Sequence, residues 1–366
     1  MALKNKLAMT LMCVLGSFIT EAKVVMPELL TKQAVNNIRF LSQDGKFTYY
    51  QKRSGSLLYS SNYTVKEFLT GKLGTQYTVI GTPARKKVIV MQNENFHNFY
   101  SQRSVERIYL LDFGQTTPKE IGTGSMAQLH LNDSWLSYYD FYTRILTFEN
   151  TTNSALKFTI KLNNKLNPYF SPQVVMSDEN TVFYTDLAEN GSVGLLQYKR
   201  IDNKAEIIYK ASNALIKAEL CIHQNRLIVG LFGLNSSKDG SEISSVDLPL
   251  VDYSKRVNLY KSPLNDIGRL ICNYDANNIA FIRNFGSDNT HSDDIVELHT
   301  SRKSILKLSD VGTISNIINM DGTLLTLDKN KYFIAKGVSD YKNVDSLKSL
   351  PPESADPATR KMDGNL

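Results

Sequence analysis

Residues 93–103 bring together side chains of the kinds that hold ligands. The segment contains three aromatic residues, a histidine and an arginine: Phe96, His97, Phe99, Tyr100 and Arg103. Aromatic rings stack on sugars and peptide groups, and imidazole and guanidinium groups donate hydrogen bonds to polar ligands. These five residues are therefore candidate ligand-binding residues. The simpler interpretation is a loop whose aromatic rings pack onto the strands beside it.

A second segment, residues 284–294, offers ligands for a metal ion. It contains one imidazole and several carboxylates: Asp288, His291, Asp293 and Asp294. Ca²⁺, Mn²⁺ and Zn²⁺ accept such ligands. The segment lacks the regular spacing and central glycine of an EF-hand loop, so a solvated acidic loop is the simpler interpretation. Asp288, His291 and Asp293 are the candidate metal ligands, and we expect no cofactor other than this divalent ion.

Signatures of catalysis are absent from the sequence. There is no Gly-x-Ser-x-Gly, no His-Glu-x-x-His and no glycine-rich phosphate loop. His130 and His223 lie at the ends of predicted innermost strands and His299 lies in a third strand, where ordinary structural histidines are the simpler interpretation. The sequence therefore favours a non-enzymatic binding protein. The alternative is a metal-dependent lyase or hydrolase that uses His130, His223 or the loop around His291.

The elements that position these residues form a repeat. Seven times a polar turn is followed at once by an apolar run, at spacings of 41 to 52 residues. The runs open at Phe47, Val88, Trp135, Val182, Leu227, Ile279 and Leu324. This period is typical of four-stranded propeller blades, and β-branched and aromatic runs between polar turns predict the strands. We predict an all-β, seven-bladed β-propeller over residues 23–337, with six blades as the alternative.

The last unit of the repeat has three predicted strands, whereas the others have four. An extended segment, residues 23–31, precedes the first unit and can supply the missing strand. Pairing this N-terminal strand into the last blade would close the propeller and remove exposed edges. In such a blade the second-to-third strand loops share one face with the connections between blades. The long loops over residues 93–103, 233–242 and 284–294 therefore predict a ligand-binding face.

Both ends of the chain differ from the repeat. Lys4 and Lys6 precede an apolar stretch over residues 7–19, and Ala22 ends a cleavage site, so residues 1–22 are predicted to be a signal peptide. The alternative is an uncleaved N-terminal anchor. After removal of the signal we expect no transmembrane span and a periplasmic or secreted protein. Residues 338–366 are rich in proline and polar residues and are predicted to be a disordered tail.

Cysteine content and charge limit the setting and the partners. Without the signal peptide the chain keeps Cys221 and Cys272, which can be bridged or can be buried free thiols. The formal net charge is +6, from 42 basic and 36 acidic residues, and no run of Lys or Arg forms a stripe. We therefore expect a protein or glycan partner and no nucleic acid.

One hairpin carries a family resemblance. The stretch Phe40-Leu41-Ser42-Gln43-Asp44-Gly45-Lys46 resembles the Phe-Ser-Pro-Asp-Gly-Lys hairpin of TolB-like propellers, and Met320-Asp321-Gly322-Thr323 is a weaker copy. The resemblance to this TolB-like and WD40-like superfamily implies the fold, an envelope setting, and binding of a protein or ligand. TolB carries an α/β domain ahead of its propeller, so its specific role is not carried over. We expect an exported propeller that binds a protein or glycan on the long-loop face.

Overall fold

The structure is a computed structural model of the chain. It describes residues 38–41, 47–52, 54–61, 64–73, 75–82, 87–93, 106–112, 115, 117–163, 170–188, 191–211, 216–233, 240–250, 252–262, 267–272, 278–285, 292–300, 305–307, 317–320, 323–328 and 331–335. The predicted signal peptide, the closing strand over residues 23–31 and the tail over residues 338–366 lie outside the described residues. Those predictions stay predictions.

Within the described residues the strands form six antiparallel sheets. The first contains β1 (Ile38–Leu41), β2 (Phe47–Gln51), β3 (Leu57–Ser61) and β4 (Thr64–Leu69). The second contains β5 (Gln76–Thr82), β6 (Lys87–Asn93), β7 (Glu106–Asp112), β8 (Lys119–His130), β9 (Trp135–Asp140), β10 (Ile145–Asn150) and β11 (Lys157–Lys161). The third contains β12 (Val174–Asp178), β13 (Thr181–Leu187), β14 (Val193–Lys199) and β15 (Lys204–Lys210).

The remaining strands complete the order. The fourth sheet contains β16 (Ile216–His223), β17 (Arg226–Gly233), β18 (Ser241–Asp247) and β19 (Val257–Ser262). The fifth contains β20 (Ile267–Ile271), β21 (Asn278–Phe285), β22 (Ser292–His299) and β23 (Ile305–Lys307), and the sixth contains β24 (Ile317–Met320), β25 (Thr323–Asp328) and β26 (Lys331–Ala335). A single 3₁₀ turn, η2 (Tyr253–Lys255), is the helical part of the described chain. The all-β prediction is confirmed.

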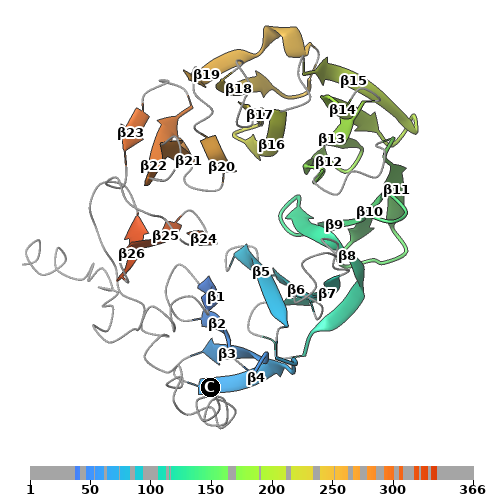
Figure 1. Cartoon of the computed structure of the whole chain (residues 1–366). Helices are drawn as coiled ribbons and strands as arrows, with labels where there is room; N and C mark the ends of the chain where they lie inside the picture. Colours follow the sequence, from blue (N-terminus) through green and yellow to red (C-terminus); the bar gives the residue numbers. More distant parts are fainter. Residues whose placement is uncertain are drawn as a thin grey trace, which may run out of the picture.

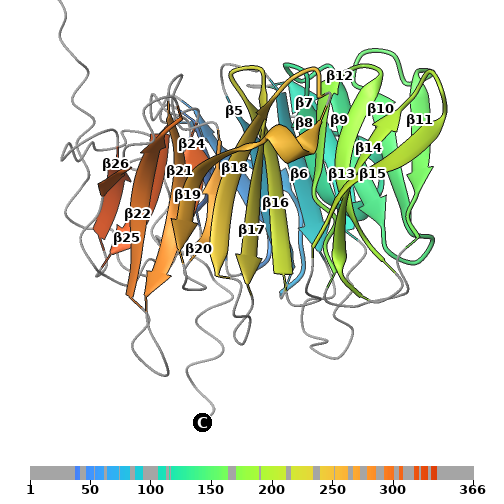
Figure 2. The same cartoon turned by 90° about the horizontal axis from the view of Figure 1, so that it is seen from above.

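The sheets follow one another around a common centre (Figure 1). In the four-stranded sheets the first strand lies nearest the centre and the fourth lies at the periphery. Seen from the side, the strands run along the axis of this arrangement (Figure 2). The last sheet returns to the first, since β24 lies next to β1. Among the described residues, no helix has the length and apolar character needed to span a bilayer.

The sequence predicts two strands in this region, over residues 119–122 and 127–131, with a turn between them, whereas the structure has the single strand β8. Its first half pairs with β7 as far as Gly124, and its second half pairs with β9 from Ser125. The ladder is irregular between Ser125 and Gln128, where Met126 has a φ of 56°. A β-bulge thus replaces the expected turn, because glycine and serine suit both conformations. One strand therefore serves two consecutive units of the repeat.

Buried apolar side chains fill the spaces between neighbouring sheets. One cluster joins the sheet β12–β15 to β16–β19 and includes Phe183 and Leu227, each 0% exposed. Another joins β9–β11 to β12–β15 and includes Trp135 and Phe148. Successive side chains of a strand point to opposite faces, so an inner strand such as β16 contributes to two such interfaces. This packing fixes the positions of the strand ends, where the connections begin.

Candidate binding face

The predicted ligand-binding residues lie outside the described part of the chain: Phe96, His97, Phe99, Tyr100 and Arg103. Asp288 and His291 also lie outside it. Asp293 is described, and it lies within β22 opposite Asn284 of β21, since these strands extend further than predicted. In the described residues no group of three His, Cys, Asp or Glu side chains is arranged to hold a metal ion. The ligand and metal sites therefore stay predictions.

Two of the candidate catalytic histidines make hydrogen bonds inside the core. His130 is 6% exposed, and its Nε2 lies 2.7 Å from the Ser137 hydroxyl on the neighbouring strand β9. His223 is 7% exposed, and its Nδ1 donates to the Cys272 carbonyl at 3.1 Å. Both contacts are those of structural histidines that satisfy buried polar groups. This favours the simpler of the two interpretations drawn from the sequence.

Connections from adjacent sheets pack on each other at one face of the molecule. The Gln51 side chain, at the end of β2, donates to the Thr75 carbonyl just before β5. Gly55 has a φ of +99°, and a Cβ there would lie 1.8 Å from the Lys72 carbonyl oxygen, so only glycine fits. We call the surface formed by residues 52, 54–56, 70–73, 75 and 141–144 the connection face. It is the face on which the long loop over residues 93–103 begins.

A buried polar network holds the strands from which that long loop starts. The side-chain nitrogen of Gln92, in β6, donates to the Thr70 carbonyl at 3.3 Å and contacts the Tyr77 hydroxyl at 3.2 Å. The Tyr109 hydroxyl donates to the side-chain oxygen of Gln92 at 3.1 Å. Each of these contacts satisfies a polar atom that would otherwise be costly to bury. The network fixes β5, β6 and β7 relative to the preceding sheet.

Glu106 begins β7 at the other end of the same loop. It lies opposite Gly124 of β8, on the strand face that also carries the buried Ile108. Burial of the carboxyl raises the pKa of Glu106 to about 7. The cause is desolvation, which disfavours the charged form. A carboxyl at the base of the loop is therefore close to half-protonated at neutral pH.

Three aromatic rings contact one another in turn from the core to the connection face, at the turn between β9 and β10. Tyr139 is buried, and its ring lies edge-on to Phe141 with ring centres 6.3 Å apart. Phe141 in turn lies edge-on to Tyr142 at 5.9 Å. Tyr142 is 60% exposed, while Asp140 Oδ1 accepts the backbone N–H groups of Tyr142 and Thr143 at 2.8 and 3.1 Å. The turn therefore presents one aromatic ring to solvent on a rigid support.

A buried carboxylate accepts hydrogen bonds from two backbone N–H groups at the same face, next to the turn that carries Tyr142. Asp186, at the end of β13, is 3% exposed and accepts the backbone N–H of Asn163 at 2.7 Å and of Leu187 at 2.8 Å. Burial and the nearby Asp186 raise the pKa of Tyr184 well above its ordinary value. Phe141 and Phe170 both pack against the same core cluster. The exposed ring of Tyr142 thus contacts Phe141, which packs against the apolar cluster between the two sheets.

Sequence reasoning missed both Glu106 and the Phe141–Tyr142 pair. A signal for the pair exists, since Asp140-Phe141-Tyr142-Thr143 places two aromatic residues in a short turn that begins with a turn-forming aspartate. Loop length does not mark this turn as a candidate, because the turn is short. No local signal marks Glu106, because its burial is a property of the folded sheet in which β7 pairs with β8.

Comparison with known proteins supports the fold and no family. No family model and no curated relative matches the chain. A prolyl endopeptidase matches with a TM-score of 0.55 and 9% identity over 83% of this chain and 51% of its own. The tricorn protease matches with a TM-score of 0.53 and 10% identity over 82% of this chain and 34% of its own. The β-propeller domain of Cps50 (Swd1) from Myceliophteria thermophila gives 0.49 and 12% identity, over 80% and 93%.

These likenesses concern the fold alone, because the sequences are so different. The chain spans about half the length of the prolyl endopeptidase and about a third of the tricorn protease. The arrangement of the sheets around a common centre, together with the two matches whose TM-scores exceed 0.5, supports a β-propeller fold. The resemblance to the propeller superfamily is confirmed at this level, and the kinship with TolB-like proteins in particular stays a prediction.

Proposed function

We propose that this protein is an exported, non-enzymatic, seven-bladed propeller that binds a protein or glycan partner on its connection face. The observation that carries the proposal is the exposed ring of Tyr142, held by Asp140 and backed by Phe141. Exposed rings on a rigid support suit partner binding, because a side chain ordered before binding loses little entropy. The Gln92 network holds strands β5 and β6 at the same face, where β6 ends at Asn93, and the candidate residues Phe96, His97, Phe99, Tyr100 and Arg103 follow in the sequence.

The blade count rests on the shared strand β8. Counted as the fourth strand of one unit and the first of the next, β8 divides the seven-stranded sheet into two four-stranded blades. The last sheet has three described strands, β24 to β26, and lies next to β1. A strand from residues 23–31 would complete it and close the ring. Closure of this kind removes the edges that an open array would expose.

Export is supported by the cysteine pair. Cys221 and Cys272 form a disulfide whose Cα atoms lie 6.1 Å apart, within the usual range for native bridges. Disulfides persist in the periplasm and outside the cell and are rare in the cytosol. The bridge therefore agrees with the signal peptide predicted over residues 1–22, and we place the protein in the periplasm or outside the cell.

A crosslinked pull-down from the envelope fraction tests the binding face. Three proteins are compared: the wild type, Tyr142→Ala, and the control Ile201→Ala. Ile201 is 79% exposed in the turn between β14 and β15. That turn lies on the opposite face, because the adjacent Arg200 stacks on Trp135, at the far end of β9 from Tyr142. We expect one specific partner that Tyr142→Ala loses and Ile201→Ala keeps. A partner that all three retain would contradict the proposed face.

A parallel screen separates the glycan partner from the protein partner. The three proteins are applied to immobilised envelope oligosaccharides, with binding read by fluorescence. Sugar binding that is lost in Tyr142→Ala identifies a glycan ligand, whereas a proteinase-sensitive pull-down identifies a protein. If neither assay yields a Tyr142-dependent signal, the proposed function is wrong. Metal analysis of the same preparations then tests the alternative, a metal-dependent lyase or hydrolase built on the loop around His291.

A further inference from the structure

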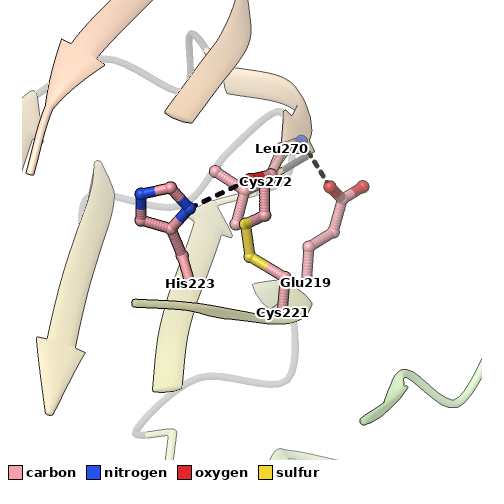
Figure 3. The surroundings of a disulfide bond; sticks show 5 residues. All are labelled: Glu219, Cys221, His223, Leu270 and Cys272. Carbon is pink, nitrogen blue, oxygen red and sulfur yellow. Dashed lines mark hydrogen bonds between the residues drawn. A yellow bond between two sulfur atoms is a disulfide. The ribbon is translucent and has the colours of Figure 1, made fainter. Parts of the chain in front are cut away.

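One face of strand β16 fastens it to the sheet that follows (Figure 3). Glu219, Cys221 and His223 are alternate residues of β16, so their side chains point to the same side. All three contact the short stretch Leu270–Cys272 at the end of β20. We call this set of contacts the clasp seam.

The three contacts differ in kind. The Glu219 carboxylate accepts the backbone N–H of Leu270 at 2.5 Å, and Cys221 is joined to Cys272 by the disulfide. His223 Nδ1 donates to the carbonyl of the same Cys272 at 3.1 Å. β16 and β20 belong to different sheets and share no backbone ladder. Side chains therefore provide the link between these two inner strands.

The opposite face of β16 is bound differently. Ala218 and Leu220, which alternate with the clasp residues, lie in the apolar cluster shared with the sheet β12–β15. Non-directional apolar packing of this kind does not respond to the redox state of the surroundings. A change at the disulfide therefore acts on one side of β16 and leaves the other side in place.

The position of the bridge in the chain also points to a local effect. Cys221 and Cys272 are 51 residues apart, which is within the range of one repeat, so the bridge ties equivalent positions of consecutive units.

Cys272 is 7% exposed, and Cys221 is only partly buried. Because Cys221 is the less buried of the two residues, we expect a dithiol reductant to attack at Cys221.

We propose that Cys221 and Cys272 form a redox-sensitive clasp that controls how firmly the sheet β20–β23 is held to β16. Reduction by a dithiol breaks the S–S bond, leaves two thiols on the protein and converts the reductant to a disulfide. The reduced seam keeps the hydrogen bonds of Glu219 and His223, which hold the two cysteines near each other for reoxidation. The region from β20 to β23 then opens more often, while β8 to β15 is unaffected.

Hydrogen exchange followed by mass spectrometry tests the clasp. Mature protein made in an oxidising compartment is compared with and without a phosphine reductant, under conditions in which both forms stay folded. We expect peptides from β20 and β21 to exchange about a thousandfold faster after reduction, as for a local opening unit that the bridge holds closed, with peptides from β9 and β10 unchanged. The double variant Cys221→Ser, Cys272→Ser should show the fast pattern without reductant and no further response to it.

Three results would overturn the proposal. Alkylation of the oxidised protein by a thiol reagent at both cysteines would show that the bridge does not form. Equal acceleration in β9–β10 and β20–β21 would show that the bridge stabilises the whole fold and clasps no particular seam. Unchanged exchange throughout would show that the hydrogen bonds and apolar contacts suffice without it. The variant Glu219→Gln, which keeps the disulfide, should change exchange at Leu270 and leave the response to reductant in place.

Discussion

Two interfaces between neighbouring sheets solve the same packing problem with different chemistry. Between β9–β11 and β12–β15, an aromatic seam stacks Phe158 on Phe148 at 4.6 Å and on Tyr198 at 6.0 Å. Arg200 covers this seam, with its guanidinium 5.5 Å from the Trp135 ring and 5.1 Å from the Phe158 ring. Between β16 and β20, the clasp seam uses a covalent bond and two hydrogen bonds. The aromatic seam does not depend on the redox state of the compartment, whereas the disulfide of the clasp seam does.

The largest expected difference between the seams is their response to reductant. Under the chain-entropy account, a disulfide that closes a loop with a separation of 51 residues stabilises the region that it clasps by about 4 kcal/mol. Hydrogen exchange of peptides from β20 and β21, followed over increasing urea with and without reductant, measures this loss, and peptides from β9 and β10 serve as the unaffected reference. The double variant Cys221→Ser, Cys272→Ser is the control and should be insensitive to reductant. A wild type with the same exchange of the β20 and β21 peptides in both conditions would remove the distinction between the seams.

Truncation of the aromatic seam should cost somewhat less and should not depend on redox state. Phe148 is 0% exposed and stacks on Phe158, so Phe148→Ala loses both apolar burial and ring contact. We expect a destabilisation of about 3 kcal/mol, equal with and without reductant. Additive effects of Phe148→Ala and reduction in urea unfolding would show two independent seams. A strong coupling between them would mean that the seams act as one unit.

A third contact, between the adjacent strands β7 and β8 of one sheet, should respond to pH instead. The pKa of Glu106 is raised from 4.5 to about 7 by burial. Its stabilising contribution is therefore complete below about pH 4.5, where the carboxyl is neutral in both states, and is lost as the pH rises through about 7. We expect Glu106→Gln to be more stable than the wild type at pH 8 and equal to it at pH 4. Thermal unfolding at these two pH values, with Glu120→Gln as an exposed control, decides this.

The order of the strands could be predicted from the sequence because it depends on local signals. Runs such as Phe47–Gln51 and Trp135–Asp140 are apolar and aromatic between polar turns, and both strands have the predicted bounds. The continuous strand β8 could not be predicted, because a bulge at Met126 and a turn use the same residue types. Element identity is thus a local property, whereas the way two units join depends on both neighbours.

The chemistry of the seams and of the connection face depends on contacts between distant residues. The sequence leaves open whether Cys221 and Cys272 are bridged or free, because their pairing depends on the geometry that the sheets impose. The raised pKa of Glu106 arises from burial of its carboxyl in the folded sheet, which no sequence window contains. Tyr142 was within reach of prediction, since its turn is signalled by Asp140, but exposure is a property of the folded surface.

The smallest expected effect belongs to the guanidinium that covers the aromatic seam. Arg200→Ala removes cation–π contacts with Trp135 and Phe158, and we expect a loss of about 1 kcal/mol. Arg200→Lys should recover part of this loss, because an ammonium keeps the charge but does not stack as a flat guanidinium does. Urea unfolding of both variants measures the difference, and tryptophan emission reports the surroundings of Trp135, the single tryptophan of the chain. If Arg200→Ala is as stable as the wild type but shifts the emission, the guanidinium covers the ring without stabilising the seam. The aromatic seam would then rest on ring stacking alone, which sharpens its contrast with the directional contacts of the clasp seam.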